Sequence, residues 1–340
     1  MQWGVSDMRN VAKLTSADRQ ELFAGTAKKA GLTVAMVEKD FWVCWTLDYL
    51  FRCCKWKNRL AFKGGTSLSK AYNLIQRFSE DIDLILDWRV LGYGADEPWE
   101  PRSNTKQDRF NKEANERTAA FLRDEVVPVI RADVSSELGA DAQIEQDAED
   151  GQTILFTYPQ EFTDLYILQK IRLEIGALAA WTPAADREIM PYAAEQYPHL
   201  FTNPSTSALT VLPERTFWEK ATILHHEANR PVGNLMPPRY SRHYFDVYYL
   251  AGSWVKETAF ADLNLLKRVV AFKRKFYPRS WAGYEYAVPG TMKLMPPAHC
   301  LKSLEDDYGH MQGMIYGEKP DYQELMDGIR ALEDEINSLL

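Results

Sequence analysis

Residues 62–70 read FKGGTSLSK, and this stretch decides how the surrounding chain is expected to fold. A short apolar run ends at Gly64 and Gly65, and adjacent glycines let a backbone turn sharply and approach a bulky anion closely. Thr66 and Ser67 then open a predicted helix, whose free N-terminal N–H groups attract phosphate. The stretch therefore predicts a buried strand, a phosphate-binding turn and a helix, although Gly-Gly-Thr also occurs where a strand simply meets a helix.

Residues 77–84 read RFSEDIDL and follow shortly afterwards. On a strand, Asp81 and Asp83 point to one face while the residues beside them point to the other. Two carboxylates a few ångströms apart repel each other unless a cation lies between them, and Mg²⁺ takes carboxylate and nucleotide phosphate oxygens together. We therefore expect Asp81 and Asp83 to be catalytic ligands of Mg²⁺, with two ions favoured and Mn²⁺ as the alternative. A solvated strand edge is the competing interpretation. Ser79 is expected either to contact the nucleotide or to turn the chain into the strand.

Periodic and alternating apolar residues predict the remaining elements. The predicted strands are residues 60–62, 81–88, 153–158, 170–178 and 208–212. The predicted helices are residues 16–31 with Ser16 as N-cap, 33–51, 66–76, 106–138 with a kink at Pro128, 214–228, 240–250, 259–276 and 321–340. The chain is thus expected to have an α+β fold, in which a small mixed β-sheet flanked by helices is followed by a mainly helical C-terminal half.

These segments resemble the nucleotidyltransferase superfamily, in which a Gly-Gly or Gly-Ser turn precedes an Asp-x-Asp strand. More narrowly, they resemble the AbiEii/AbiGii family of phage-defence and toxin–antitoxin toxins. That family carries a Gly-Gly-Thr-x-Leu turn and an Arg-x-Ser-x-Asp-x-Asp-Leu strand, which residues 64–68 and 77–84 match. Its Glu-Lys-Asp helix, its lysine-bearing helix and its Arg-x-x-x-Asp helix are matched by residues 38–40, 219–220 and 242–246.

The resemblance covers roughly residues 33–250. The predicted elements place a nucleotidyltransferase-like domain with N-terminal helices at residues 1–205 and a mainly helical C-terminal domain at residues 206–340. The resemblance adds an expectation about the site. It implies a third carboxylate on a neighbouring strand, and Glu174 in the segment KIRLEIG is the candidate catalytic metal ligand. The alternative is that Glu174 pairs with Arg172 on an exposed strand face.

Lys220 and Asp246 are the candidates in the second half. The resemblance implies that Lys220 holds the triphosphate of an NTP, whereas most lysines on such helices extend to solvent. Asp246 lies among aromatic and apolar residues, so its charge needs a partner, which Lys220 or Arg242 is expected to supply. We expect Lys220 and Asp246 in the catalytic set and Arg242 beside the nucleotide. A purely structural ion pair between two helices is the alternative.

The expected reaction transfers an NMP from an NTP to an acceptor and releases pyrophosphate. By resemblance, the acceptor is RNA, with a tRNA 3′ end favoured, and a cognate antitoxin is a candidate partner. Three alternatives stay open. They are a protein hydroxyl as acceptor, a non-catalytic module that binds NTP or a partner, and a small-molecule nucleotidyltransferase such as an aminoglycoside-modifying enzyme.

Charge and composition bear on the acceptor and the compartment. The net charge of −8 favours a protein acceptor, but residues 215–279 hold 12 Lys and Arg against 5 Asp and Glu. A basic segment on an acidic body can steer a polyanion to one face, so RNA is modestly favoured. No apolar run approaches the roughly 20 residues of a membrane span. The four cysteines lack zinc-type spacing, so we expect a cytoplasmic protein with reduced thiols and no membrane partner.

Overall fold

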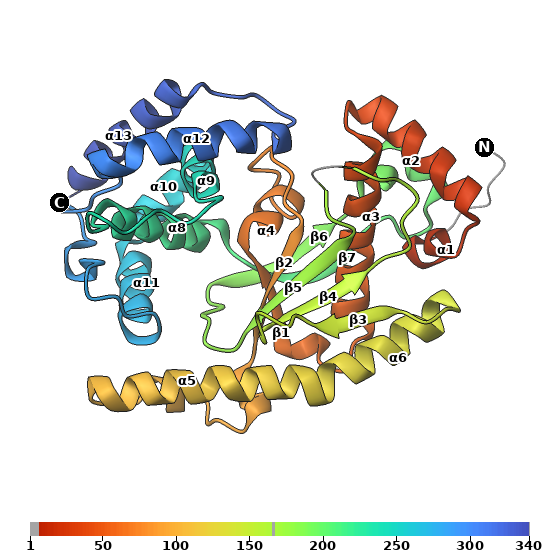
Figure 1. Cartoon of the computed structure of the whole chain (residues 1–340), viewed down its shortest axis with the longest axis horizontal. Helices are drawn as coiled ribbons and strands as arrows, with labels where there is room; N and C mark the ends of the chain where they lie inside the picture. Colours follow the sequence, from red (N-terminus) through yellow and green to blue (C-terminus); the bar gives the residue numbers. More distant parts are fainter. Residues whose placement is uncertain (1–6, 165–166, 340) are drawn as a thin grey trace. The chain divides into compact units, whose positions relative to one another are not determined.

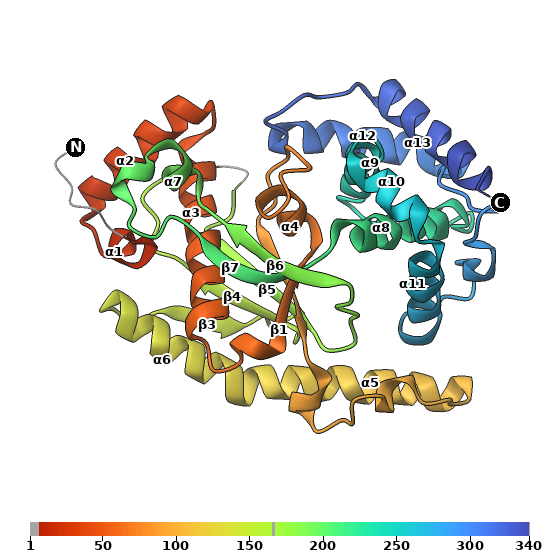
Figure 2. The same cartoon turned by 180° about the vertical axis from the view of Figure 1, so that it is seen from behind.

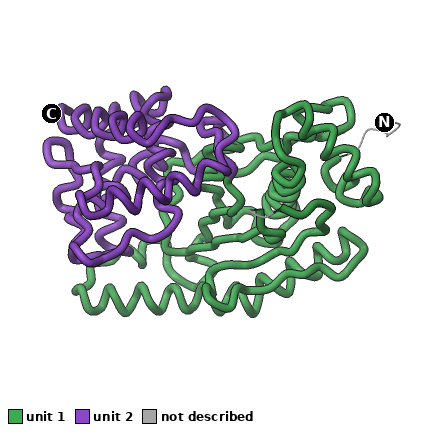
Figure 3. Tube along the Cα trace, turned by 45° about the horizontal axis from the view of Figure 1, so that its top comes forward, with its two compact units in different colours: residues 1–71, 79–210 green, residues 72–78, 211–340 purple. Residues whose placement is uncertain are grey.

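The computed structural model describes residues 7–164 and 167–339 (Figure 1). The chain forms two compact units, which Figure 3 colours separately. The first unit comprises Met1–Ala71 and Ser79–Thr210, and the second comprises Tyr72–Phe78 and Val211–Leu340. The sequence division at residues 205/206 kept residues 72–78 in the first domain, whereas the structure assigns them to the second unit.

The predicted helix over residues 66–76 is too long, because residues 72–78 belong to the second unit. Helix α4 spans Gly64–Lys70 and ends there. Beyond it, Arg77 forms an isolated antiparallel bridge with Ile315, and the Phe78 N–H donates to the Met314 carbonyl at 2.7 Å. The carbonyl of Gln76, the last residue of the predicted helix, accepts the Tyr316 and Gly317 N–H groups at 3.1 and 3.2 Å, so the end of this segment bonds to residues about 240 positions away along the chain.

The first unit is built on a sheet whose order, among the described residues, is β3-β4-β5-β2-β1-β7-β6. Neighbours β1/β2, β3/β4 and β4/β5 are antiparallel, while β2/β5 and β1/β7 are parallel. The α+β class and the mixed sheet flanked by helices are therefore confirmed. The strands are β1 Leu60–Lys63, β2 Asp81–Leu86, β3 Gln143–Gln146, β4 Thr153–Thr157, β5 Lys170–Gly176, β6 Ala184–Ile189 and β7 Thr206–Val211.

Strands β3 and β6 are the two that the sequence patterns did not predict. They form the two edges of the sheet, and most of their side chains are exposed or half-buried. An edge strand with few buried residues carries little apolar alternation, so it resembles a polar loop in sequence.

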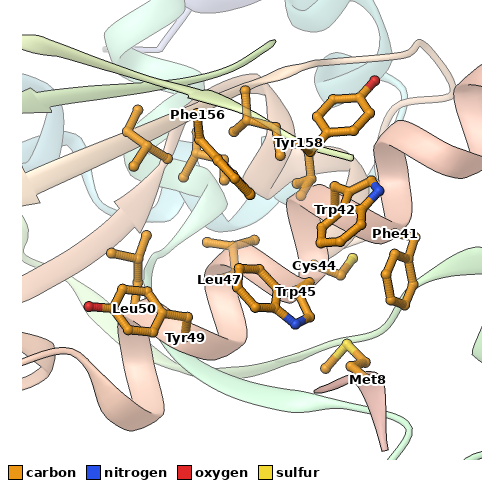
Figure 4. Close-up of a cluster of buried hydrophobic side chains, with 14 of the residues drawn as sticks. Met8, Phe41, Trp42, Cys44, Trp45, Leu47, Tyr49, Leu50, Phe156 and Tyr158 are labelled. Atoms are coloured by element: carbon orange, nitrogen blue, oxygen red, sulfur yellow. The ribbon is translucent and has the colours of Figure 1, made fainter. Parts of the chain in front are cut away.

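Helix α3 lies across one face of the sheet, and α1, α2 and α7 pack against it (Figure 2). Helix α3 is buried along almost its whole length, as its apolar and aromatic residues, among them Trp42 and Trp45, predict. Figure 4 shows Trp42 and Trp45 of α3 beside Phe156 and Tyr158 of β4 and its C-terminal flank, with Trp45 and Phe156 centroids 6.0 Å apart. The α-helices of the described part of the first unit are α1 Met8–Ala12, α2 Ser16–Ala30, α3 Val34–Asp48, α4 Gly64–Lys70, α5 Asn104–Phe121, α6 Val127–Leu138 and α7 Tyr192–Gln196.

Two details of these helices differ from expectation. Thr15, rather than Ser16, caps α2, because its hydroxyl accepts the Asp18 N–H. The long helix predicted over residues 106–138 is interrupted by a π-helical turn at Leu122–Val126, and Pro128 then lies in the first turn of α6, where a missing N–H is tolerated.

The second unit is mainly helical, as expected. The helix predicted over residues 259–276 is two helices, because the Asp262 side chain caps a new start by accepting the Leu265 N–H at 3.2 Å. None of the helices in the described part of the chain is long and apolar enough to cross a membrane. The helices of this unit are α8 Pro213–Ala228, α9 Ser241–Ala251, α10 Trp254–Ala261, α11 Leu263–Phe276, α12 Leu301–Met311 and α13 Tyr322–Asn337.

Candidate active site

The glycine turn lies directly against the aspartate strand. Gly64 has a positive φ of 82°, and a Cβ atom added to it would overlap the carboxylate of Asp83. In the antiparallel pair of β1 and β2, Lys63 is the partner of Asp83, which brings the following glycine beside that side chain. Only glycine fits here, both because of its φ and because of the space that the carboxylate takes.

The two aspartates share one face of β2. Asp81 and Asp83 are half-buried, while Ile82 and Leu84 between and after them are buried in the core. The parallel register with β5 places Glu174 beside Asp83. In adjacent strands, residues in register point to the same face. The three carboxylates predicted from the sequence thus come from one face of two neighbouring strands.

Arg172 is one cation of this face, and the sequence patterns indicated it only as a competing partner of Glu174. Its Nε lies 3.7 Å from Glu174 Oε1 and 4.0 Å from Asp81 Oδ1, and its Nη1 donates to Asp147 at 2.8 Å. The Glu174 side chain is 43% exposed. Both interpretations of Glu174 therefore describe part of its surroundings, since it is in register with Asp83 and also close to Arg172.

The donor chemistry of this face fits a divalent cation. Asp81 and Asp83 offer carboxylate oxygens on one face of β2, and the Asp83 carboxylate lies directly against the backbone of Gly64. Within residues 7–164 and 167–339, however, no three His, Cys, Asp or Glu side chains stand close enough together to form a metal site. The residues that fit a metal are thus the aspartate pair, with Glu174 adjacent in register.

The hydroxyls predicted to bind nucleotide make contacts inside the loop. The Thr66 hydroxyl donates to the Asp81 carbonyl and lies 2.9 Å from Ser79 Oγ, and the Ser67 hydroxyl donates to the Gly64 carbonyl at 2.8 Å. Thr66 and Ser67 are fully buried. Their side chains therefore fasten the glycine turn to the start of β2.

In the second unit, Asp246 is held by two cations. Arg77 donates Nε and Nη2 to its two carboxylate oxygens at 2.7 and 2.8 Å, and Lys220 Nζ lies 2.9 Å from Oδ2. Burial by itself would raise the pKa of the Asp246 carboxyl, but Arg77 and Lys220 outweigh it and hold the pKa well below its ordinary value. Burial lowers the pKa of Lys220, and Asp246 opposes that shift.

Lys220, one of the two partners expected for Asp246, contacts its carboxylate. The bidentate partner is Arg77, the first residue of RFSEDIDL, for which the sequence patterns predicted no role. The ion cluster of Arg77, Lys220 and Asp246 carries two positive charges against one negative charge.

A protein-family model matches most of this chain. The model of the family described as nucleotidyl transferase AbiEii toxin, type IV toxin–antitoxin system, matches residues 48–332. The chain belongs to this family. It is therefore an AbiEii-type nucleotidyltransferase toxin, and membership of a toxin–antitoxin family implies a cognate antitoxin.

Two solved structures are similar to this AbiEii-type toxin. One is MenT4, a nucleotidyltransferase toxin from Mycobacterium tuberculosis H37Rv, with a TM-score of 0.44, 16% sequence identity, and coverage of 93% of this chain and 97% of that chain. The other is JHP933 from Helicobacter pylori, with a TM-score of 0.34, 16% identity, and coverage of 89% and 97%. No curated protein matches the chain.

The AbiEii toxin also buries three consecutive ionisable residues of α3, at 0 to 3% exposure: Glu38, Lys39 and Asp40. The Glu38 carboxylate accepts the N–H groups of Glu161 and Phe162 at 2.6 and 3.1 Å. Burial raises the pKa of Glu38 to about 7, although these two hydrogen bonds oppose the shift. The sequence matched this triplet to a family motif but assigned it no role, because its partners lie far away in the chain.

The other two members of the triplet contact segments next to the site. Lys39 Nζ lies 2.6 Å from Glu80 Oε2 and donates to the Leu168 carbonyl at 2.7 Å. Asp40 pairs with Lys70, the last residue of α4, at 2.8 Å. Hydrogen bonds and ion pairs thereby join helix α3 to helix α4 and to the residue that precedes β2.

Proposed function

We propose that this toxin transfers an NMP from an NTP to the 3′ end of an RNA, with tRNA as the favoured acceptor, in the bacterial cytoplasm. The observation that carries the proposal is the face of β2, where Asp81 and Asp83 lie beside a glycine turn and no side chain of residue 64 stands between its backbone and the Asp83 carboxylate. Catalysis of this class requires two carboxylates on one face and a backbone that a triphosphate can approach.

Asp81 and Asp83 would hold Mg²⁺, or Mn²⁺, and Glu174 is the proposed third ligand. One or two such ions, when bound, activate the attacking hydroxyl and offset the charge on the leaving group. The 3′-hydroxyl oxygen of the RNA bonds to the α-phosphorus of the NTP. The bond from that phosphorus to the bridging oxygen breaks, pyrophosphate leaves with the electron pair, and the hydroxyl proton passes to solvent.

The remaining residues are assigned to nucleotide binding. Gly64 and Gly65 let the backbone approach the phosphates, and Thr66 and Ser67 contribute backbone N–H groups while their hydroxyls, with Ser79, hold the loop. For the second unit, we propose that Lys220 and Arg242 contact the NTP. Asp246 keeps Lys220 in place, and the net positive charge of its ion cluster supports phosphate binding.

The basic surface of α11 supports RNA as the acceptor. Lys267, Arg268 and Arg274 are exposed on this helix, and Arg279 is exposed just after it. Cationic side chains on one helix suit a phosphodiester backbone, whose counterions they displace.

The decisive experiment incubates the purified toxin with each α-labelled NTP, Mg²⁺ and total cellular RNA. Label in RNA, sensitive to ribonuclease and lost in Asp81→Ala, is the expected result. Label in protein instead would identify a protein NMP-transferase. Binding of NTP without any transfer would identify a non-catalytic module, and transfer to a small molecule such as an aminoglycoside would identify the third alternative.

A further inference from the structure

Lys39 occupies a position that fold stability alone does not explain. It is 1% exposed in the core of the first unit, where an ionised ammonium is costly unless it is paired and hydrogen-bonded. Consecutive residues of a helix point about 100° apart. Glu38, Lys39 and Asp40 therefore reach three different segments, and the hydrogen bonds of Lys39 to Glu80 and Leu168 lie on the segments that precede the strands carrying the candidate metal ligands.

The two acceptors of Lys39 lie just before the first residues of two neighbouring strands, positions called here the entries of these strands. Glu80 immediately precedes β2, and Leu168 lies two residues before β5. Because β2 and β5 are parallel neighbours, their N-terminal ends lie on the same side of the sheet, beside each other. A single ammonium thus joins the two segments that lead, a few residues later, to Asp83 and Glu174.

We propose that Lys39 is a positioning residue of the nucleotidyl-transfer site. Its ammonium joins the entry of β2 to the entry of β5 and thereby sets the spacing between the Asp81 and Asp83 carboxylates and Glu174. The inference rests on the proposed function only in requiring that these carboxylates bind a divalent ion. A lysine suits this task because its compact charge carries three donors, and here it supplies one to a side chain and one to a backbone carbonyl.

The test variant removes the bridge without leaving a buried charge. Lys39→Met combined with Glu80→Gln deletes one positive and one negative charge, so the net charge beside the site does not change. Replacing a buried ion pair with neutral groups of similar size is often close to neutral for stability. Should this double variant fail to fold, Glu80→Asp keeps the charge and shortens only the reach toward Lys39.

A matched control lies on the same helix. Asp48 of α3 is also 1% exposed, and its carboxylate accepts hydrogen bonds from Arg9 at 3.2 Å and Arg52 at 3.0 Å. None of these three residues belongs to β2, β5 or their entries. Asp48→Asn should lower the melting temperature without altering metal binding.

The measurement is calorimetric titration of each full-length variant with Mn²⁺ alone, with Asp83→Ala defining the binding that belongs to this site. We expect the double variant to weaken Asp83-dependent Mn²⁺ affinity about tenfold and Glu80→Asp to weaken it about threefold, while Asp48→Asn leaves it unchanged. Unchanged affinity in the folded double variant would overturn the inference, as would an equal loss in Asp48→Asn. If the wild type shows no Asp83-dependent Mn²⁺ site, the metal part of the proposed function fails and this inference fails with it.

Discussion

Gly64 places the backbone of the glycine turn directly against the carboxylate of Asp83. Its positive φ and its contact with Asp83 both exclude a side chain, so the aspartate carboxylate has the backbone of the turn as a neighbour. An NTP that binds at this turn would therefore have its phosphates next to Asp83, with no intervening side chain from residue 64.

The first prediction concerns the aspartate pair. Asp81→Ala or Asp83→Asn should lower the rate of NMP transfer at least about 100-fold, because each change removes a charged metal ligand worth several kcal/mol in the transition state. Radiolabel transfer measures the rate, and circular dichroism verifies the fold. Asp124→Asn, an exposed partner of Arg123, is the control. Full activity in either aspartate variant would contradict the proposal that Asp81 and Asp83 hold the catalytic metal.

The second prediction concerns the pH dependence of stability. Because burial raises the pKa of Glu38 to about 7, above an unfolded value of about 4.3, the folded state binds more protons between these values. Stability supplied by the protonated form is therefore lost as the pH rises through 7. From pH 5 to pH 8, the free energy of unfolding of the wild type should fall by about 2–3 kcal/mol relative to Glu38→Gln. Parallel pH profiles from urea titrations would show that Glu38 is already ionised at pH 5.

The third prediction separates the two roles of Lys220. Lys220→Ala should raise the KM for NTP and lower kcat, because a cation that meets phosphate is lost. Asp246 retains its bidentate bond to Arg77, so we expect only about 1–3 kcal/mol of destabilisation. Steady-state kinetics and thermal melts of the same sample test both parts. Unaltered kinetics with a lower melting temperature would make Lys220 purely structural.

At the scale of elements, α11 carries the fourth prediction. Within the basic stretch of residues 215–279, Lys273, Arg274 and Lys275 are consecutive, but Lys273 is half-buried and donates to the Glu219 carbonyl at 2.8 Å. The exposed bases are better probes. Reversing Lys267, Arg268 and Arg274 to glutamate should reduce RNA labelling about tenfold or more and flatten its dependence on salt, without affecting NTP binding.

The control for α11 reverses the same number of charges elsewhere, at three exposed bases of the α5 region: Lys112, Arg117 and Arg123. Salt-dependent RNA labelling that falls equally in both triple variants would indicate a loss of overall charge rather than a binding surface on α11.

The sequence predicted those elements whose evidence is local. The glycine turn and the Asp-x-Asp strand lie within 23 consecutive residues, 62–84, and α3 is apolar enough to identify directly. The pairs that hold them in place are distant along the chain, since 169 residues separate Arg77 from Asp246 and 41 separate Lys39 from Glu80. No periodicity links such residues, so neither Arg77 nor Lys39 received a role. The edge strands were missed because they bury too little apolar surface.

At the scale of the whole molecule, the fifth prediction concerns growth. Induced expression of the wild-type chain should slow bacterial growth, whereas Asp81→Ala at equal protein level should not, because a tRNA with an extended 3′ end cannot be aminoacylated normally. Optical density and quantitative blotting provide the comparison. If the Asp81→Ala chain is equally toxic, the growth defect arises from something other than nucleotidyl transfer.

The excursion of residues 72–78 into the second unit has a consequence for how the protein is made. Arg77 pairs with Asp246 and forms a bridge with Ile315, and residue 315 is translated 238 residues after residue 77. At about 5–20 residues per second, the ribosome needs roughly 12–48 s to cover that distance. Throughout that interval Arg77 lacks its bridge partner Ile315. A nascent chain cannot assemble the Arg77–Asp246 pair until residue 246 has been translated, and transcripts broken upstream of the Asp246 codon yield products that never assemble it.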